Sequence, residues 1–213
     1  MKVCVSLTRP DNEMMERTLQ EAEMLEFRLD LIGKSPKDLA PWLAAEVPAV
    51  VTCRPGKLPD EKRKKWLVGA MEAGADYVDI DLHKNDPAMK AHIIQAARSM
   101  DKKIIMSYHN FVETPTKREL QHIIKQGFQE KADIVKLATM VQHYHDNALL
   151  ISLYADYENI IALGMGALGK ITRVSALFSG APFMYAAVDE ANNAAPGQFS
   201  YRELMHLRSF FAR

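Results

Sequence analysis

The sequence predicts a (β/α)8 TIM barrel, a fold in which eight parallel strands alternate with helices. Short apolar stretches typical of strands alternate with segments whose apolar residues have helical spacing. Eight such strand–helix units fit into 213 residues, with roughly 22–31 residues from one strand start to the next. This length lies at the compact end of the range for closed barrels. The main alternative, an open doubly wound sheet, would normally use fewer strands in this length.

The composition is that of an ordinary globular protein with one core, since 48% of the residues are hydrophobic and 25% are charged. Basic and acidic residues balance at 27 each, so the net charge attracts neither nucleic acid nor an anionic membrane. The two cysteines, Cys4 and Cys53, match no metal-ligand spacing and favour a reducing, cytoplasmic setting. Low-complexity tracts are absent from the sequence, so residues 1–213 are expected to form a single (β/α)8 barrel domain.

The eight strands are expected where apolar residues cluster over short stretches. In chain order these stretches are residues 2–7, 24–32, 49–54, 77–82, 102–109, 133–140, 159–166 and 181–188. Parallel strands need a crossover connection, and a helix usually provides it. The segments between the stretches are therefore expected to be helices.

These helical segments show both an apolar face and start signals. In one of them, apolar residues recur at i, i+3, i+4 and i+8: Leu120, Ile123, Ile124 and Phe128. Helix starts are indicated by Ser35-Pro36, by Asn85-Asp86-Pro87, and by Thr116 followed by Glu119. A last helix is expected from about Ser200.

Polar residues lie in the second half of several predicted strands. In residues 24–32, Glu26, Arg28 and Asp30 alternate with apolar residues and would share one face of the strand. An exposed face of an antiparallel sheet would explain them, but both faces of a parallel barrel are covered. Aligned charges in a barrel need partners or a ligand. The next strands end in further polar residues, namely Arg54, Asp79, Asp81, Ser107 and His109.

Lys136 is the unusual residue of the stretch DIVKLATM (133–140), which otherwise reads as a buried strand. An edge strand with the lysine in water is the simplest explanation. His109, however, ends the preceding strand, and neighbouring strands lie only about 4.8 Å apart. The two side chains could then converge on one substrate atom, with Lys136 as an amine nucleophile. We therefore expect Lys136 to point into the barrel.

The glycine-rich stretch GMGALGKIT (164–172) is similar to a phosphate-binding loop. Ile171 stands where serine or threonine must ligate magnesium, so the motif is incomplete. As a turn that leads into a helix, the stretch could still offer backbone N–H groups to an anion.

In chain order, these residues resemble the type I 3-dehydroquinate dehydratases, the Schiff-base dehydratases of the shikimate pathway. The matching stretches are EFRLD (26–30), TCR (52–54), SYHNF (107–111), DIVKLA (133–138), GMGALGKITR (164–173) and APGQ (195–198). Each stretch is unspecific by itself, but the ordered set across nearly the whole chain is highly specific. The resemblance implies a (β/α)8 barrel, commonly a homodimer, that uses neither a metal nor an organic cofactor.

By this resemblance, Lys136 and His109 are the catalytic residues. Lys136 matches the lysine that forms an imine with the ketone of 3-dehydroquinate, and His109 matches the general acid/base. A protonated imine is a better electron sink than a carbonyl, so His109 would remove the adjacent proton and the enamine would expel water. Hydrolysis of the imine would release 3-dehydroshikimate.

The resemblance also implies six substrate-binding residues. Arg173 matches the arginine that clamps the substrate carboxylate, for which a guanidinium is well shaped. Gln198 resembles the tip of a loop that closes over the substrate, and Ser6 matches a serine near the substrate. The groups that read the ring hydroxyls and fix the surroundings of the lysine correspond to Glu26, Arg28 and Arg54.

Two departures from the family pattern stand out. Family members usually carry Glu-Gly-Gly shortly after the third-strand arginine, and its Glu orients the catalytic histidine; this chain reads RPGKLPDEKR at 54–63. Asp60, Glu61 and Asp81 are the alternatives for that role. A serine often precedes APGQ in the family, whereas this chain has Ala194, which would remove one hydroxyl contact to the substrate.

Two other functions remain open from the residues alone. An aldolase-type Schiff-base barrel acting on a sugar phosphate would also use Lys136 and the glycine-rich turn. Alternatively, the barrel could bind a small acid without turning it over. Borohydride reduction in the presence of 3-dehydroquinate separates these functions, because only the dehydratase gives both a Lys136 adduct and 3-dehydroshikimate.

Overall fold

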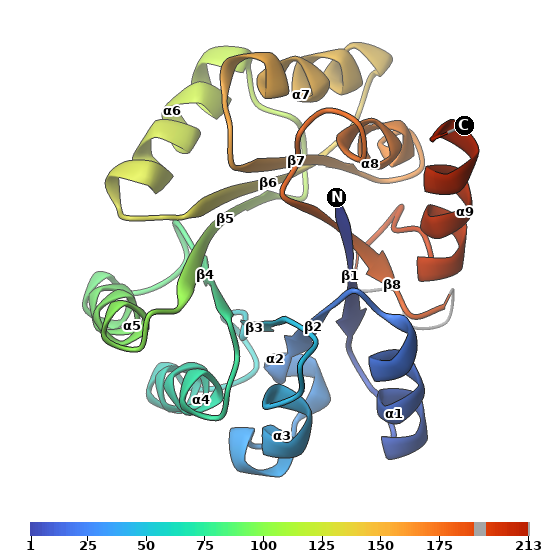
Figure 1. Cartoon of the computed structure of the whole chain (residues 1–213). Helices are drawn as coiled ribbons and strands as arrows, with labels where there is room; N and C mark the ends of the chain where they lie inside the picture. The colour runs from blue at the N-terminus through green and yellow to red at the C-terminus, as the bar shows by residue number, and fades with distance from the viewer. Residues whose placement is uncertain (190–194, 213) are drawn as a thin grey trace.

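Eight parallel strands form the centre of the computed structural model, which describes residues 1–189 and 195–212 (Figure 1). The strands are β1 (Lys2–Leu7), β2 (Met24–Arg28), β3 (Ala49–Thr52), β4 (Tyr77–Asp81), β5 (Lys103–Asn110), β6 (Ile134–Met140), β7 (Ile160–Met165) and β8 (Phe183–Ala187). Their hydrogen-bonded order is β7-β6-β5-β4-β3-β2-β1-β8, and each of these pairs is parallel. The predicted TIM barrel is confirmed.

Helices surround the strands on the outside (Figure 1). They are α1 (Asn12–Glu21), α2 (Leu29–Ile32), α3 (Pro36–Leu43), α4 (Asp60–Glu72), α5 (Pro87–Ser99), α6 (Lys117–Gln129), α7 (Tyr144–Asp156), α8 (Lys170–Ala176) and α9 (Tyr201–Phe211). The predicted helix starts are confirmed: Ser35 and Thr116 form capping boxes, and the Asp86 side chain caps α5. A capping box at Ser200 also begins the last helix.

The inside of the barrel is apolar at one end and polar toward the other. Ile105 and Ile134 belong to a buried apolar cluster. Two residues further along the same strands, and therefore on the same face, lie Ser107 and Lys136. The apolar layer fills the inside of the barrel toward the amino ends of the strands. The polar layer lies next to it, nearer the carboxyl ends, and is called the polar floor below.

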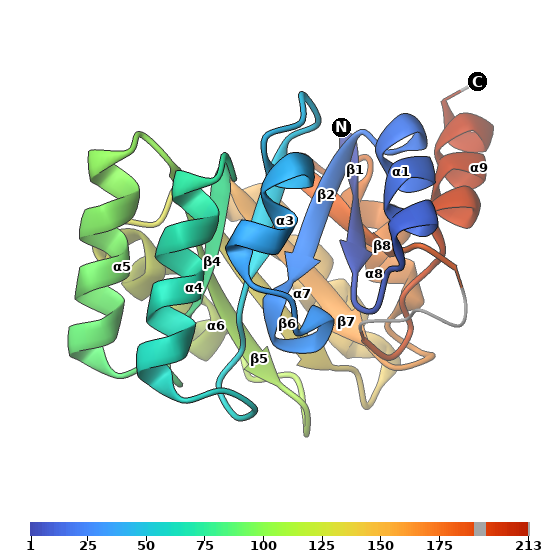
Figure 2. The same cartoon turned by 90° about the horizontal axis from the view of Figure 1, so that it is seen from below.

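The carboxyl ends of the strands face one end of the barrel, while the N-terminus and the end of α9 lie at the other (Figure 2). In this fold, the loops at the carboxyl ends of the strands carry the functional residues. Across residues 1–189 and 195–212, no helix is long and apolar enough to cross a membrane.

The predicted strand at 24–32 is too long. The strand ends at Arg28, and Leu29–Ile32 forms the short helix α2. Asp30 therefore does not share a strand face with Glu26 and Arg28, as the alternating pattern suggested. The helical turn brings Asp30 back to Arg28 instead, with 2.8 Å between Arg28 Nη2 and Asp30 Oδ2. This ion pair favours the turn over a longer strand.

Candidate active site

One cavity of about 390 Å³ opens at the carboxyl ends of the strands. It is lined by all eight residues that the sequence predicts for the site: Ser6, Glu26, Arg28, Arg54, His109, Lys136, Arg173 and Gln198. These residues come from four strands (β1, β2, β5 and β6), from helix α8, and from the loops that follow β3 and precede α9. The structure therefore brings the predicted residues together, while their roles remain predictions.

Lys136 points into the barrel and is only 6% exposed. Its strand β6 pairs with β5 and β7, so the explanation as an exposed edge-strand lysine is wrong. Lys136 Nζ lies 2.9 Å from Asp79 Oδ2 and 4.3 Å from the centroid of the Tyr185 ring. Because the contact with Asp79 is an ion pair, Lys136 has to give up a proton before its amine can attack a carbonyl carbon.

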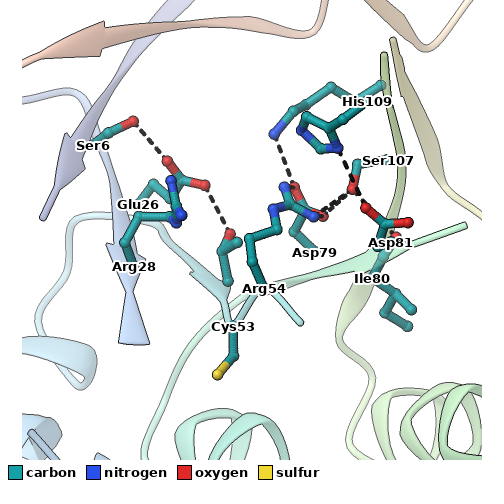
Figure 3. A network of polar contacts seen from close by, with 12 residues as sticks. Ser6, Glu26, Arg28, Cys53, Arg54, Asp79, Ile80, Asp81, Ser107 and His109 are labelled. Atoms are coloured by element: carbon teal, nitrogen blue, oxygen red, sulfur yellow. Dashed lines mark hydrogen bonds and ion pairs between the residues drawn. The ribbon is translucent and has the colours of Figure 1, made fainter. Parts of the chain in front are cut away.

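Asp79 is the centre of the polar floor (Figure 3). Its carboxylate accepts hydrogen bonds from Arg54 Nη1 and Nη2, at 2.8 and 2.7 Å, and from Ser107 Oγ at 2.5 Å. Burial alone would raise the pKa of Asp79, but the charges of Arg54 and Lys136 hold it well below its ordinary value. Asp79 therefore stays ionised and fixes the positions of Arg54 and Lys136.

Sequence reasoning placed Asp79 and Ser107 at strand ends but gave them no role. The signal was present in YVDIDL, where Asp79 and Asp81 alternate along a strand that should be buried. Arg54 was predicted to bind substrate; its guanidinium is already engaged by Asp79 and Ser107. This arrangement favours the second part of that prediction, in which Arg54 fixes the surroundings of the lysine.

His109 lies on β5, next to Lys136 on β6, because Ser107 is level with Lys136 in the pairing and His109 follows two residues later. His109 Nδ1 is 3.5 Å from Asp81 Oδ2, longer than a normal hydrogen bond. The backbone N–H groups of His83 and Lys84 donate to Asp81 Oδ1 at 3.2 and 2.8 Å. The Asp81 carboxylate is thus held in place beside the imidazole.

Burial and the nearby charge of Arg54 lower the pKa of His109 to about 4, although Asp81 acts in the opposite direction. His109 is therefore neutral near pH 7 and can accept a proton. Asp81 is the one of the three candidate carboxylates that lies beside this histidine. Asp60 instead pairs with Arg63, and the exposed Glu61 pairs with Lys64.

Arg173 on α8 is only 1% exposed. Its Nε and Nη2 atoms have no hydrogen-bond partner among the described residues. Burial lowers the pKa of Arg173 to about 10. A buried guanidinium without a partner is costly unless a ligand supplies the missing acceptor, and a carboxylate matches its two parallel N–H groups. The cavity therefore contains a site that fits a carboxylate.

On the β1–β3 side of the cavity, Glu26 accepts hydrogen bonds from Ser6 Oγ at 2.6 Å and Thr52 Oγ1 at 2.7 Å (Figure 3). Gln198 Nε2 lies 3.5 Å from Ser6 Oγ, so the loop before α9 reaches this group. The buried carboxylate of Glu26 offers acceptor positions to the hydroxyls of a ligand. Ala194, the residue expected to replace a family serine, lies outside the described residues.

The loop before α9 rests on the turn that follows β7. Gly166 N donates to Pro196 O at 3.2 Å, and Gly197 has a φ of 77°, which favours glycine. A Cβ on Gly197 would lie 2.3 Å from the carbonyl oxygen of Gly166. The close approach that places Gln198 over the cavity thus requires glycine at 197.

Replacing Gly197 by alanine is expected to lift this loop and move Gln198 away from the cavity, raising KM while the melting temperature changes little. Loops of this kind contribute less to global stability than the barrel. Steady-state kinetics and thermal unfolding measure the two effects. Gly180→Ala is the matched control, because Gly180 also has a positive φ, of 93°, but has open space around it. A KM that rises equally in both variants would contradict the contact with Gly166.

The comparisons with known proteins agree with this geometry. Residues 3–212 match the family model described as Type I 3-dehydroquinase. The curated 3-dehydroquinate dehydratase of Dehalococcoides mccartyi (strain ATCC BAA-2266 / KCTC 15142 / 195) is 30% identical, over 96% of this chain and 93% of its own. That of Methanosarcina barkeri is 35% identical, over 86% of this chain and 83% of its own.

A crystal structure supports the same relationship. The 3-dehydroquinate dehydratase of Aquifex aeolicus superimposes with a TM-score of 0.84 at 25% identity, covering 100% of both chains. The family model spans nearly the whole sequence, and the relatives named above are similar over most of their length. This chain is therefore a member of the type I 3-dehydroquinase family.

Proposed function

We propose that this protein is a carbon–oxygen lyase of the shikimate pathway, a 3-dehydroquinate dehydratase that forms an imine between Lys136 and its substrate. The observation that carries the proposal is the position of Lys136 and His109 on adjacent strands of one cavity. The same cavity contains Arg173, whose Nε and Nη2 have no hydrogen-bond partner among the described residues. An amine, a neutral base and a carboxylate site are the three groups that elimination from a keto acid through an imine requires.

The reaction begins when the Arg173 guanidinium binds the substrate carboxylate and the ketone carbon comes to rest against Lys136. The neutral amine attacks that carbon, and loss of water gives a protonated imine. His109 then removes a proton from the neighbouring carbon, and the electron pair moves toward the imine nitrogen. The enamine returns this pair and expels the β-hydroxyl, which takes its proton from His109. Hydrolysis frees the product and Lys136.

The other predicted residues would position the ring. Glu26 offers acceptor positions near its contacts with Ser6 and Thr52, while Gln198 closes the cavity from the loop above. Arg28 lines the cavity while paired with Asp30. We propose that these side chains contact the ring hydroxyls, with the loop excluding water from the imine.

Borohydride reduction in the presence of 3-dehydroquinate tests this function. A mass increase located on Lys136, together with the absorbance of 3-dehydroshikimate in the unreduced reaction, supports the dehydratase. Turnover without an adduct would contradict the imine, and an adduct without turnover would contradict the elimination.

A sugar-phosphate aldolase fits the site less well. Its phosphate would need free backbone N–H groups at the glycine-rich turn after β7. Gly164 N instead donates to Thr172 Oγ1 at 2.8 Å, and Gly166 N donates to Pro196 O. These two N–H groups are therefore engaged in internal hydrogen bonds, whereas Arg173 keeps Nε and Nη2 without partners among the described residues and suits an anion better.

Replacing Asp81 by asparagine is expected to move the acid limb of the kcat/KM profile to lower pH. His109 must be unprotonated to act as a base, so activity falls as the pH drops through its pKa of about 4. Asp81 raises that pKa, and the amide would no longer do so. We also expect kcat to fall by roughly tenfold, part of the 10²–10⁴ that general acid–base catalysis contributes.

Glu61→Gln is the control for this experiment, because Glu61 was also a candidate from the sequence but pairs with Lys64. An unchanged profile for Asp81→Asn, or an equal shift for Glu61→Gln, would contradict the role of Asp81. Short assays are needed at acid pH. Between about 6.5 and 4 the unfolded chain binds a proton at His109 that the folded protein does not, so the free energy of unfolding falls as the pH decreases.

The cytoplasmic location and the homodimer also remain proposals. Exposed aromatic residues support an interface between two copies, since Phe178, Phe210 and Phe211 form an edge-to-face cluster near α8 and α9. Such apolar clusters on a protein surface often mark contact sites.

A further inference from the structure

Buried polar atoms without partners are concentrated at the cavity. Among the described residues, five buried side-chain nitrogen or oxygen atoms have no hydrogen-bond partner. Four of them belong to residues that line the cavity: His109 Nδ1, Arg173 Nε, Arg173 Nη2 and the hydroxyl of Tyr185. Because buried polar groups are normally hydrogen-bonded, such a concentration indicates where a ligand supplies the missing partners.

Three of these four atoms are accounted for, since His109 Nδ1 faces the Asp81 carboxylate and Arg173 Nε and Nη2 form the proposed carboxylate site. Arg173 is assigned to the substrate carboxylate and His109 to proton transfer. The hydroxyl of Tyr185 is unexplained, and sequence reasoning missed it because the stretch APFMYAAV reads as an apolar core strand. Tyr185 is 4% exposed, so water from the surface does not satisfy its hydroxyl either.

The position of Tyr185 next to Lys136 restricts what its hydroxyl can reach. Tyr185 lies on β8, level with Cys4 on β1, and its ring centroid is 4.3 Å from Lys136 Nζ. The hydroxyl is at the edge of this same ring. When Lys136 attacks a ketone, the ketone oxygen is bonded to the attacked carbon and is therefore the substrate oxygen nearest to Nζ. It comes within reach of the phenol.

We propose that the Tyr185 hydroxyl donates a hydrogen bond to the oxygen of the ketone that Lys136 attacks, both as the imine forms and as it is hydrolysed. This inference rests on the proposed function. The carbon–nitrogen bond forms as the π pair of the carbonyl moves onto oxygen, and a neutral donor aimed at that oxygen stabilises the developing charge. His109 carries the proton from nitrogen to oxygen, and Tyr185 keeps its own proton.

The environment of Tyr185 suits a donor that stays protonated. Burial, together with the carboxylates of Glu26 and Asp79, raises its pKa well above the ordinary value for tyrosine. The phenol is therefore neutral across the pH range in which the protein would work. Asp79 is engaged by Arg54, Ser107 and Lys136, so it does not compete for the hydroxyl hydrogen.

Tyr185→Phe tests the inference, because it removes the hydroxyl and keeps the ring against Lys136. The rate of imine formation, followed by borohydride trapping at timed intervals with 3-dehydroquinate, is expected to fall about tenfold, the effect of one lost hydrogen bond. The dissociation constant of a cyclohexane carboxylate with the same hydroxyls but no ketone is expected to stay unchanged, since the Arg173 and Glu26 contacts remain.

Tyr154→Phe is the matched control. Its hydroxyl is hydrogen-bonded to the backbone of Ala162 at 2.9 and 3.2 Å and lies outside the cavity lining, so trapping should keep the wild-type rate. An unchanged trapping rate in Tyr185→Phe would overturn the inference, and so would an equal loss of affinity for the ketone-free analogue. Absence of an adduct in the wild-type protein would instead overturn the proposed function.

Discussion

Replacing Lys136 by methionine is expected to lower kcat by roughly 10⁴–10⁶-fold, as removal of a nucleophile does in enzymes that react through a covalent intermediate. Methionine keeps much of the length of the side chain and removes the amine. The fold should survive, because Asp79 keeps its hydrogen bonds from Arg54 and Ser107. Steady-state kinetics, circular dichroism and borohydride trapping measure activity, fold and adduct separately.

Lys103→Met is the matched control, since Lys103 begins the neighbouring strand β5 but its side chain is 58% exposed outside the cavity. It should leave both the adduct and kcat unchanged. A Lys136→Met protein that still gives an adduct would show that another lysine forms the imine. The alternatives are Lys57 and Lys84, which lie in loops that line the cavity.

The fold could be predicted from the sequence because the strand–helix alternation is regular and the helix starts carry their own signals. The capping residues Ser35, Asp86 and Thr116 stand where the structure begins α3, α5 and α6. The second strand was predicted too long because an alternating pattern cannot reveal the ion pair between Arg28 and Asp30. Such a pair depends on the geometry of the turn that it stabilises.

The site could be predicted as a set of residues, since polar side chains at the ends of parallel strands meet at one end of a barrel. The contacts that each of these residues makes could not be predicted from the sequence. Asp79 and Asp81 belong to the same alternating pattern. Only the three-dimensional structure shows that Asp79 pairs with Lys136 and that Asp81 lies beside His109. Tyr185 gave no signal, because an aromatic residue in an apolar strand is usually core.

Arg173→Met is expected to weaken substrate binding by about 100-fold and, at the same time, to make the protein more stable. The loss of affinity follows because truncating one partner of a buried charged pair costs about 2–5 kcal/mol. The gain in stability follows because Arg173 is buried without a hydrogen-bond partner for Nε and Nη2 among the described residues. An apolar side chain of similar length avoids that cost, by about 1–3 kcal/mol.

Arg63 provides the control that separates a ligand-binding arginine from a structural one. It is equally buried, at 1% exposure, but donates to the Cys53 carbonyl at 3.1 and 3.0 Å and to Asn85 Oδ1 at 2.5 Å. Arg63→Met leaves these acceptors unsatisfied and is expected to lower the free energy of unfolding by about 3–5 kcal/mol. Urea unfolding of the two variants should therefore give shifts of opposite sign. If Arg173→Met is destabilised as much as Arg63→Met, Arg173 serves the fold, and the carboxylate must bind elsewhere in the cavity.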